Sequence, residues 1–405
     1  MKRLLMATTA LCLGAGTAAA DVALSGSAEM GVAGSKDDSA RFHTDVNVKF
    51  GLSGTTDGGI TFGSAIELAE SGDGSPAVDD DDEHGGISVF MKGPFGNVEM
   101  GDADGAYDWA LAEIVGVGGG AIRDDHEHGA YDGNGGLDGK HDGQILRYDI
   151  AIGSGFEFGA SVELSDDKDG QPGGKTYDPI FGAGGKFSMP MNFGNLALGG
   201  GFQMGSFDHA IMDGHPDPAD ATKKRTIWGS GGPVAGHDGE VEGAIFGGSA
   251  KLDVGGADSG GSWHVIANGS LMEADGSVTH GPAAARVTTT ADVEATYLGI
   301  GLGYAVGDLS MGVNFANKVT ESTVDPNNRA NADSTVIETT VNGVGFTAAY
   351  ALGGGAEIQF GVGSSETEND YTYNGRPAAL SGSGEGGHDS SSDTNKWSLG
   401  VAFSF

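Results

Sequence analysis

The chain has 405 residues, a formal net charge of −36 and 76 glycines. So acidic a protein is not expected to bind nucleic acid, and its 38% hydrophobic residues fall in alternating patches rather than the low-complexity tracts of a disordered chain. Beyond residue 20, no apolar run reaches the roughly 18 residues that a membrane helix needs, which excludes a helical membrane protein.

Residues 1–20 have the layout of a secretory signal peptide. Two basic residues precede the short apolar stretch Leu4–Gly16, and Ala18–Ala20 offers a cleavage site of small residues. We therefore expect cleavage after residue 20, with residues 21–405 as the mature domain. Cys12 is the only cysteine and lies in the cleaved segment, so the mature chain is expected to have no disulfide and no thiolate metal site.

Apolar and polar side chains alternate along much of the mature chain. In residues 40–54, for example, Phe42 and Phe50 share one face while Arg41 and Lys49 fall on the other. Strands of this kind are predicted at 21–34, 40–54, 58–70, 86–93, 96–102, 143–153, 155–165, 179–191, 195–207, 241–254, 261–273, 289–306, 308–320, 334–352, 356–365 and 394–405. A soluble β-sandwich also alternates, so the pattern alone does not decide the fold.

The connections between the predicted strands alternate in length. Tight turns such as Gly153-Ser154 alternate with long acidic stretches, the longest being 103–142. Outer-membrane barrels show this asymmetry, with short turns on the periplasmic side and long loops outside. We therefore predict an all-β protein, a transmembrane antiparallel up-and-down β-barrel of about 16 strands; about 14 or 18 also fit, because predicted boundaries shift by a few residues.

Three segments resemble the general porins of Gram-negative bacteria. Gly93–Gly101 is similar to the G-x-F-G-x-V-x-x-G turn that precedes the constriction loop of these porins, and Asp21–Val32 resembles the first strand of porins from photosynthetic and related alpha-proteobacteria, the Rhodobacter-like family. The last strand ends on Phe403 and Phe405, like the closing strand of an outer-membrane barrel, where the terminal aromatic is read by the assembly machinery.

The resemblance implies a function and a location. Members of the family are 16-stranded barrels, usually homotrimers, that let small hydrophilic solutes and ions diffuse passively across the outer membrane. The expected surroundings are outer-membrane lipids and lipopolysaccharide, and no cofactor is required. The third long loop, here about 103–142, would fold into the lumen and narrow it.

The family places acids on this loop opposite basic residues on the barrel wall. The expected acidic side is Asp102, Asp104, Asp108, Glu113, Asp124, Asp125 and Glu127. The expected basic wall is Arg41, Lys49 and Arg147; the less favoured alternative is local ion pairs with inward acids such as Asp45 and Asp149. Many porins carry Arg where this chain has Asp102, which weakens the basic wall, so we expect a preference for cations.

Two further clusters have metal-ligand chemistry. The run Asp79, Asp80, Asp81, Asp82 and Glu83 offers hard oxygen ligands for Ca²⁺, although such a run is more often a solvated loop. His126, Glu127 and His128, with His141 nearby, fit a metal or pH-sensing site, and simple loop histidines are the alternative.

Rival functions are a substrate-specific outer-membrane channel, an outer-membrane barrel enzyme such as a lipase or protease, and a secreted Ca²⁺-dependent β-roll. No motif isolates a catalytic nucleophile, so we do not expect an enzyme. The β-roll would need a repeated G-G-x-G-x-D nonapeptide, and Gly135-Gly136-Leu137-Asp138 occurs without repetition.

Overall fold

The computed structural model describes residues 21–36, 38–72, 84–141, 144–164, 178–207, 212–217, 220–226, 238–256, 260–280, 287–326, 335–373, 376–377 and 390–405. The predicted signal peptide, residues 1–20, and the acidic run from Asp79 to Glu83 lie outside the described residues. Cleavage after residue 20 and Ca²⁺ binding by the acidic run therefore stay predictions.

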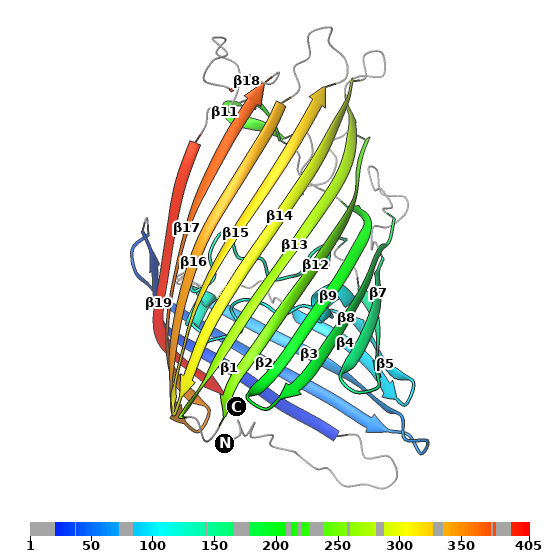
Figure 1. The fold of residues 1–405 in the computed structure, drawn as a ribbon, viewed down its shortest axis with the longest axis vertical. Coiled ribbons are helices and arrows are strands. Elements are labelled where there is room, and N and C mark those ends of the chain that lie inside the picture. Colours follow the sequence, from blue (N-terminus) through cyan, green and yellow to red (C-terminus); the bar gives the residue numbers. More distant parts are fainter. Residues whose placement is uncertain are drawn as a thin grey trace.

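Sixteen antiparallel strands close into a barrel within the described residues. They are β1 (Asp21–Ser35), β2 (Arg41–Thr55), β3 (Thr61–Gly72), β4 (His84–Gly93), β5 (Gly96–Gly101), β6 (Ile145–Ile152), β7 (Phe156–Glu163), β8 (Ile180–Met191), β9 (Gly194–Phe207), β12 (Asp238–Gly256), β13 (Gly261–His280), β14 (Val287–Val306), β15 (Leu309–Pro326), β16 (Thr335–Gly353), β17 (Ala356–Tyr373) and β19 (Ser390–Ser404). Each pairs with the next, and β19 pairs with β1 to close the wall (Figure 1). The predicted barrel of about 16 strands is confirmed.

The structure differs from the sequence prediction in the part of the barrel that extends beyond the membrane-crossing region. The predicted loop 208–240 contains a separate hairpin, β10 (Met212–Asp217) with β11 (Asp220–Thr226), and the two-residue β18 (Arg376–Pro377) pairs with β17. Several wall strands are also longer than predicted; β17 continues past residue 365 to Tyr373. The prediction ended strands where outward residues stopped being apolar, but the hydrogen-bonded ladder continues beyond that point.

Two helices occur in the described part of the chain, α1 (Ala106–Ala110) and the 3₁₀ helix η1 (Ile122–Asp124). Neither is long and apolar enough to span a membrane.

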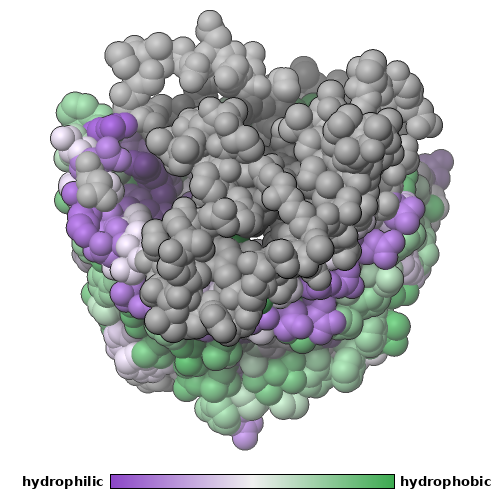
Figure 2. Space-filling model, turned by 90° about the horizontal axis from the view of Figure 1, so that it is seen from above, coloured by the Kyte–Doolittle hydropathy of each residue, from purple (hydrophilic) through white to green (hydrophobic). Residues whose placement is uncertain are grey.

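The outer face of the wall is apolar, as the alternation predicts. Phe42 is 82% exposed and Leu298 is 64% exposed, although both are large hydrophobic side chains. Figure 2 shows hydrophobic residues around the outside of the wall, with hydrophilic residues nearer the viewer. Exposed apolar surface of this extent is stable against lipid rather than water.

Acidic side chains form a row on the outside of five long strands. The residues lie directly opposite one another across β13 to β17 and are exposed; this acidic row consists of Glu273, Glu294, Glu321, Glu338 and Asp370. A charge facing hydrocarbon is costly, so the apolar part of the bilayer must end below the acidic row. On β14 the stretch from Thr296 to Val306 rises about 25 Å at the usual strand rise and tilt, which matches the apolar band of outer-membrane barrels.

The acidic row should destabilise the barrel slightly, because like charges directly opposite each other repel. Glu294 faces two acids, Glu273 and Glu321. We predict that Glu294→Gln stabilises the detergent-solubilised barrel by about 0.5 kcal/mol at low salt, measured as a higher thermal unfolding midpoint. The matched control is Glu368→Gln on β17, where the outward acid faces Thr340 and Ser391. Equal shifts in both variants would contradict the prediction.

Candidate functional site: the loop inside the barrel

The segment after β5 turns into the barrel and lies against its inner wall, as the resemblance implied. We call residues 102–141 the lumen loop. Its outgoing half follows the wall from β7 to β19 through hydrogen bonds donated by Ala106 N to Ser161 Oγ (2.9 Å), by Ala112 N to Ser249 Oγ (2.9 Å), by Thr347 Oγ1 to Gly120 O (2.9 Å) and by Ser398 Oγ to Ile122 O (2.6 Å). The lumen loop therefore runs along the inner wall, about halfway up the barrel (Figure 1).

The returning half follows the same strands in reverse. Its contacts are His128 Nε2 with Asn314 Oδ1 (2.8 Å), Asn268 Nδ2 donating to Asn134 Oδ1 (2.9 Å), Leu137 N donating to Gln203 Oε1 (2.7 Å) and His141 N donating to Glu163 Oε1 (3.1 Å). These inward polar side chains satisfy loop backbone and side-chain groups that would otherwise be buried without partners.

Apolar packing between the lumen loop and the wall forms the barrel's buried core. Tyr107 and Leu137 pack with Ile180 and Val241 of the wall, and Ile114 packs with Ile266 in a second cluster. The core therefore lies inside the barrel, on the side where the loop is attached.

Glycines on the inner wall let the loop backbone lie directly against the strands. A Cβ at any of five of them would overlap a carbonyl oxygen of the loop; these are Gly184 against Ala106, Gly199 against Ala110, Gly301 against Ile114, Gly303 against Val117 and Gly345 against His126. Such close backbone approach is a recurrent reason for Gly within a strand. Part of the high glycine content is thereby explained.

We predict that Gly301→Ala pushes the loop off β14, because the new Cβ overlaps the Ile114 carbonyl oxygen. Overpacking of this kind costs about 1–3 kcal/mol. Single-channel conductance should fall as the loop moves into the passage, and the loop should become sensitive to protease. Gly200→Ala is the control, since its Cβ would meet only Gly247 O, at 3.8 Å. Identical behaviour of the two variants would contradict the prediction.

Acids crowd around α1, at the start of the lumen loop. Burial, followed by the charges of Asp104 and Asp138, raises the pKa of Asp108 to about 7. Burial also raises the pKa of Asp138 to about 6, although Gly105 N donates a 2.8 Å hydrogen bond to its carboxylate. Glu113 accepts a 2.8 Å hydrogen bond from the Tyr131 hydroxyl, and burial raises its pKa as well. The negative charge of this region therefore depends on pH near neutrality.

We predict that cation preference rises as the pH increases through about 7. Below that pH Asp108 is protonated and neutral; above it the carboxylate adds a negative charge beside Asp104, Glu113, Asp132 and Asp138. The measurement is the reversal potential under a salt gradient between pH 5 and pH 8. Asp108→Asn should reduce the step near pH 7; the part that remains comes from other groups, including Glu127, whose pKa burial also raises to about 7. A pH profile unchanged by Asp108→Asn would refute the assignment.

Arg147 does not line the open lumen, although it was predicted as basic wall. It is 7% exposed and lies beneath the lumen loop, where it donates to Asp104 O (2.6 Å), Glu99 Oε2 (2.8 Å) and Asp149 Oδ1 (3.2 Å). Its guanidinium carbon also lies 5.8 Å from the centre of the Trp109 ring. Arg147 therefore anchors the loop to the wall. Of the two interpretations of this residue from the sequence, pore lining or a local ion pair with Asp149, the structure shows the ion pair.

Arg41 and Lys49 also have acidic partners. Arg41 is exposed and lies 3.4 Å from Asp38, and Lys49 lies 3.5 Å from Glu67 across β2 and β3. The two loop helices pack on β6 to β9 and on β1, β17 and β19. Lys49 and Glu67 lie on β2 and β3, in an arc of the wall that these helices do not cover and that borders the passage. Pairing with acids reduces the positive field that these two residues present to the lumen.

Three inward lysines near the lumen loop were missed by the sequence prediction. Lys186 Nζ lies 3.9 Å from the Trp109 ring centre, Lys318 Nζ lies 4.0 Å from Asp132 Oδ2, and Lys396 interacts electrostatically with Glu127. Each has the inward parity of its strand, so the alternation could have identified them. The acids Asp132 and Asp138 were likewise left out of the predicted site, although they lie in the predicted loop.

The remaining predicted acids differ in exposure. Asp102 and Asp124 are exposed and Glu127 is half-buried. Asp125 is 1% exposed and faces the wall, so it is not an open-lumen acid as predicted. The loop packs closely against the wall at this point: a Cβ on Gly363 of β17 would lie 2.7 Å from Asp125 O.

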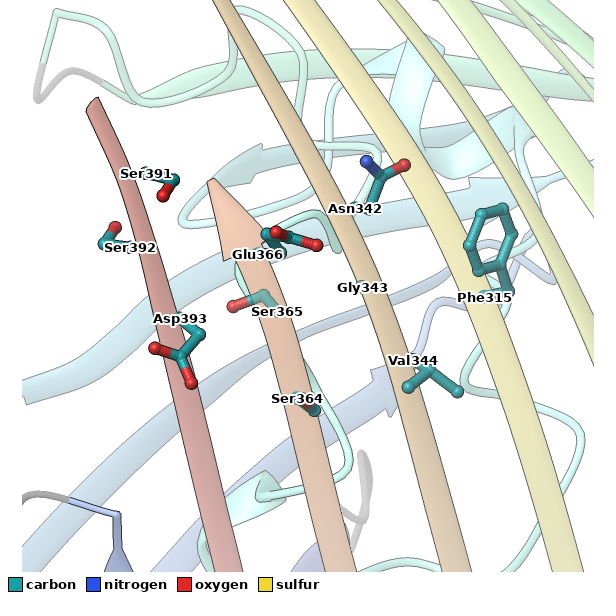
Figure 3. Close-up of a pocket in the computed structure, with 10 residues that line it drawn as sticks. All are labelled: Phe315, Asn342, Gly343, Val344, Ser364, Ser365, Glu366, Ser391, Ser392 and Asp393. Carbon is teal, nitrogen blue, oxygen red and sulfur yellow. The ribbon is translucent and has the colours of Figure 1, made fainter. Parts of the chain in front are cut away.

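A groove of about 580 Å³ lies between the upper parts of β15, β16, β17 and β19 (Figure 3). Its lining residues Phe315, Val344 and Glu366 share the outward parity of their strands, so the groove opens on the outside of the barrel. It is not part of the lumen.

The fold and the lumen loop together define a class of protein. A closed barrel with an apolar outside, a polar inside and a loop that narrows the lumen is a membrane channel of the β-barrel type.

Comparisons with known proteins give the family. A family model described as Gram-negative porin matches residues 7–370, and the chain belongs to this family. A porin of Rhodobacter capsulatus is 31% identical over 198 residues, which cover 47% of this chain and 59% of that protein, so the match spans less than two thirds of its length.

Two solved structures share the fold. A porin structure refined at 1.8 Å resolution has 22% identity and a TM-score of 0.51, and the alignment covers 95% of this chain and 100% of that one. The trimer form of OmpT, an outer-membrane protein of Vibrio cholerae, has 13% identity and a TM-score of 0.52, with 95% and 99% covered. The predicted resemblance to Rhodobacter-like porins is confirmed.

Proposed function

We propose that the chain forms a water-filled channel for passive diffusion of small hydrophilic solutes and ions, with a preference for cations. The observation that carries the cation preference is the group of acids on the lumen loop around Asp108, while Arg147 lies beneath the loop and Lys318 pairs with Asp132. Fixed negative charge at the narrowest part of a pore raises the local cation concentration and repels anions. The proposal is a channel without catalytic activity.

The test is reversal potential in a planar bilayer under a salt gradient. The wild type should be cation-selective, and the double variant Asp104→Asn, Asp108→Asn should lower the ratio of cation to anion permeability several-fold while conductance persists. Glu368→Gln is the control, because it removes a charge on the outer face. Anion selectivity of the wild type would refute the cation preference, and absence of conductance would refute the channel.

We further propose that the protein is exported with residues 1–20 removed and assembles as a homotrimer in the outer membrane. Support comes from the family and from the matched structure of OmpT in its trimer form. Phe403 and Phe405 are proposed as the assembly signal; Phe403 lies on β19, Phe405 directly follows this strand, and the two ring centres lie 6.4 Å apart. The acidic row is proposed to lie at the polar level of the outer leaflet, among lipid and lipopolysaccharide headgroups.

A further inference from the structure

Three side chains at the tip of the lumen loop converge on one point. Asp124, His126 and Glu127 each offer one potential ligand atom, and the three atoms lie within 4.8 Å of one another. Two are carboxylate oxygens and one is an imidazole nitrogen. The sequence had suggested His126 and Glu127 as partners of His128, but His128 is instead bonded to Asn314 of the wall. In the structure, Asp124 rather than His128 is the third member of the cluster.

The backbone brings these residues together in a tight turn. Glu127 N donates a 2.9 Å hydrogen bond to Asp124 O, and both Arg123 (φ 59°) and Asp124 (φ 46°) adopt left-handed conformations. The left-handed residues turn the chain at the end of η1, so that side chains close in sequence meet on one side of the loop.

A second, independent observation points to a ligand. His126 is only 4% exposed, and its Nδ1 is buried without a hydrogen-bond partner in the structure. The wall holds this residue in place: Asn314 Nδ2 donates to His126 O at 3.4 Å, and Gly345 leaves room for that carbonyl. A buried nitrogen without a partner is costly, and the cost is removed when the nitrogen gains one.

We propose that Asp124, His126 and Glu127 bind a divalent transition-metal ion, best fitted by Zn²⁺, at the constriction of the channel. Imidazole nitrogen with carboxylate oxygen suits Zn²⁺ and its first-row neighbours, whereas Ca²⁺ and Mg²⁺ take oxygen ligands. Asp124 is exposed, so the ion enters from the lumen water and keeps open positions for water ligands.

The geometry is compatible with this assignment. Ligand atoms around tetrahedral Zn²⁺ lie about 3.4 Å apart, given bond lengths of about 2.0–2.2 Å. The three side chains therefore need to close by at most about 1.4 Å, which side-chain rotation at a loop tip allows. Lys396 is the nearby cation that opposes binding electrostatically.

Isothermal titration calorimetry on the full protein in detergent, freed of metal with EDTA, tests the site directly. We expect one Zn²⁺ per chain with micromolar affinity, at least tenfold weaker binding in His126→Ala, and no displacement by equimolar Ca²⁺. Asp124→Asn, an exposed position that leaves the buried packing unchanged, should also weaken binding tenfold. Asp108→Asn is the control for general attraction to loop acids and should retain the affinity.

Several results would overturn the proposal: no Zn²⁺ binding by the wild type, wild-type affinity in His126→Ala or in Asp124→Asn, or Ca²⁺ binding with the same affinity as Zn²⁺. A second readout rests on the proposed channel function. Micromolar Zn²⁺ should reduce the cation current of the wild type, reversibly with EDTA, and leave the Asp124→Asn current unchanged. If the protein carries no current, the channel proposal fails while calorimetry still decides the metal site.

Discussion

Hydrogen bonding of the backbone in hydrocarbon is the constraint on which this structure depends. No water is available there, so every strand must pair on both sides and the sheet must close. Closure is made by β19 against β1, down to the reciprocal hydrogen bonds between Gly26 and Phe405. A sheet of sixteen strands, closed in this way, encloses a lumen too wide to be filled by wall side chains. The interior must therefore be narrowed by another part of the chain.

The lumen loop meets this need and also supplies the packing that the wall lacks. Its apolar residues form the buried clusters around Tyr107 and Ile114, and its carbonyl groups lie directly against wall glycines such as Gly301 and Gly303. Glycine lowers the intrinsic preference for a strand. Glycine is used here because the inward face of the wall must leave room for the backbone of the lumen loop.

Alternation predicted the barrel wall because successive residues of a strand face lipid and water in turn, so apolar and polar side chains alternate along the sequence. It could not predict the upper ends of several strands, where outward residues such as Asp370 on β17 are polar although the ladder continues. Nor could it predict Arg147, whose inward parity was recognised but whose burial depends on α1 lying over it. The convergence of Asp124 with His126 depends on two left-handed residues and on wall contacts distant in sequence, which no periodicity reveals.

The electrostatics of the loop follow from how it is attached. Acids that are partly buried and close together raise one another's pKa, so keeping them ionised opposes folding of the loop. The contacts that hold the loop are mostly uncharged: amide and hydroxyl side chains of the wall, glycine contacts and apolar clusters. Because attachment does not depend on neutralising Asp104 and Asp108 with wall lysines, their charge is left for the passing ions. Arg147 and Glu163 are charged wall residues that also hold the loop. Arg147 donates to the backbone carbonyl of Asp104 and to wall acids, and Glu163 accepts from backbone N–H groups of the loop, so neither of them neutralises Asp104 or Asp108.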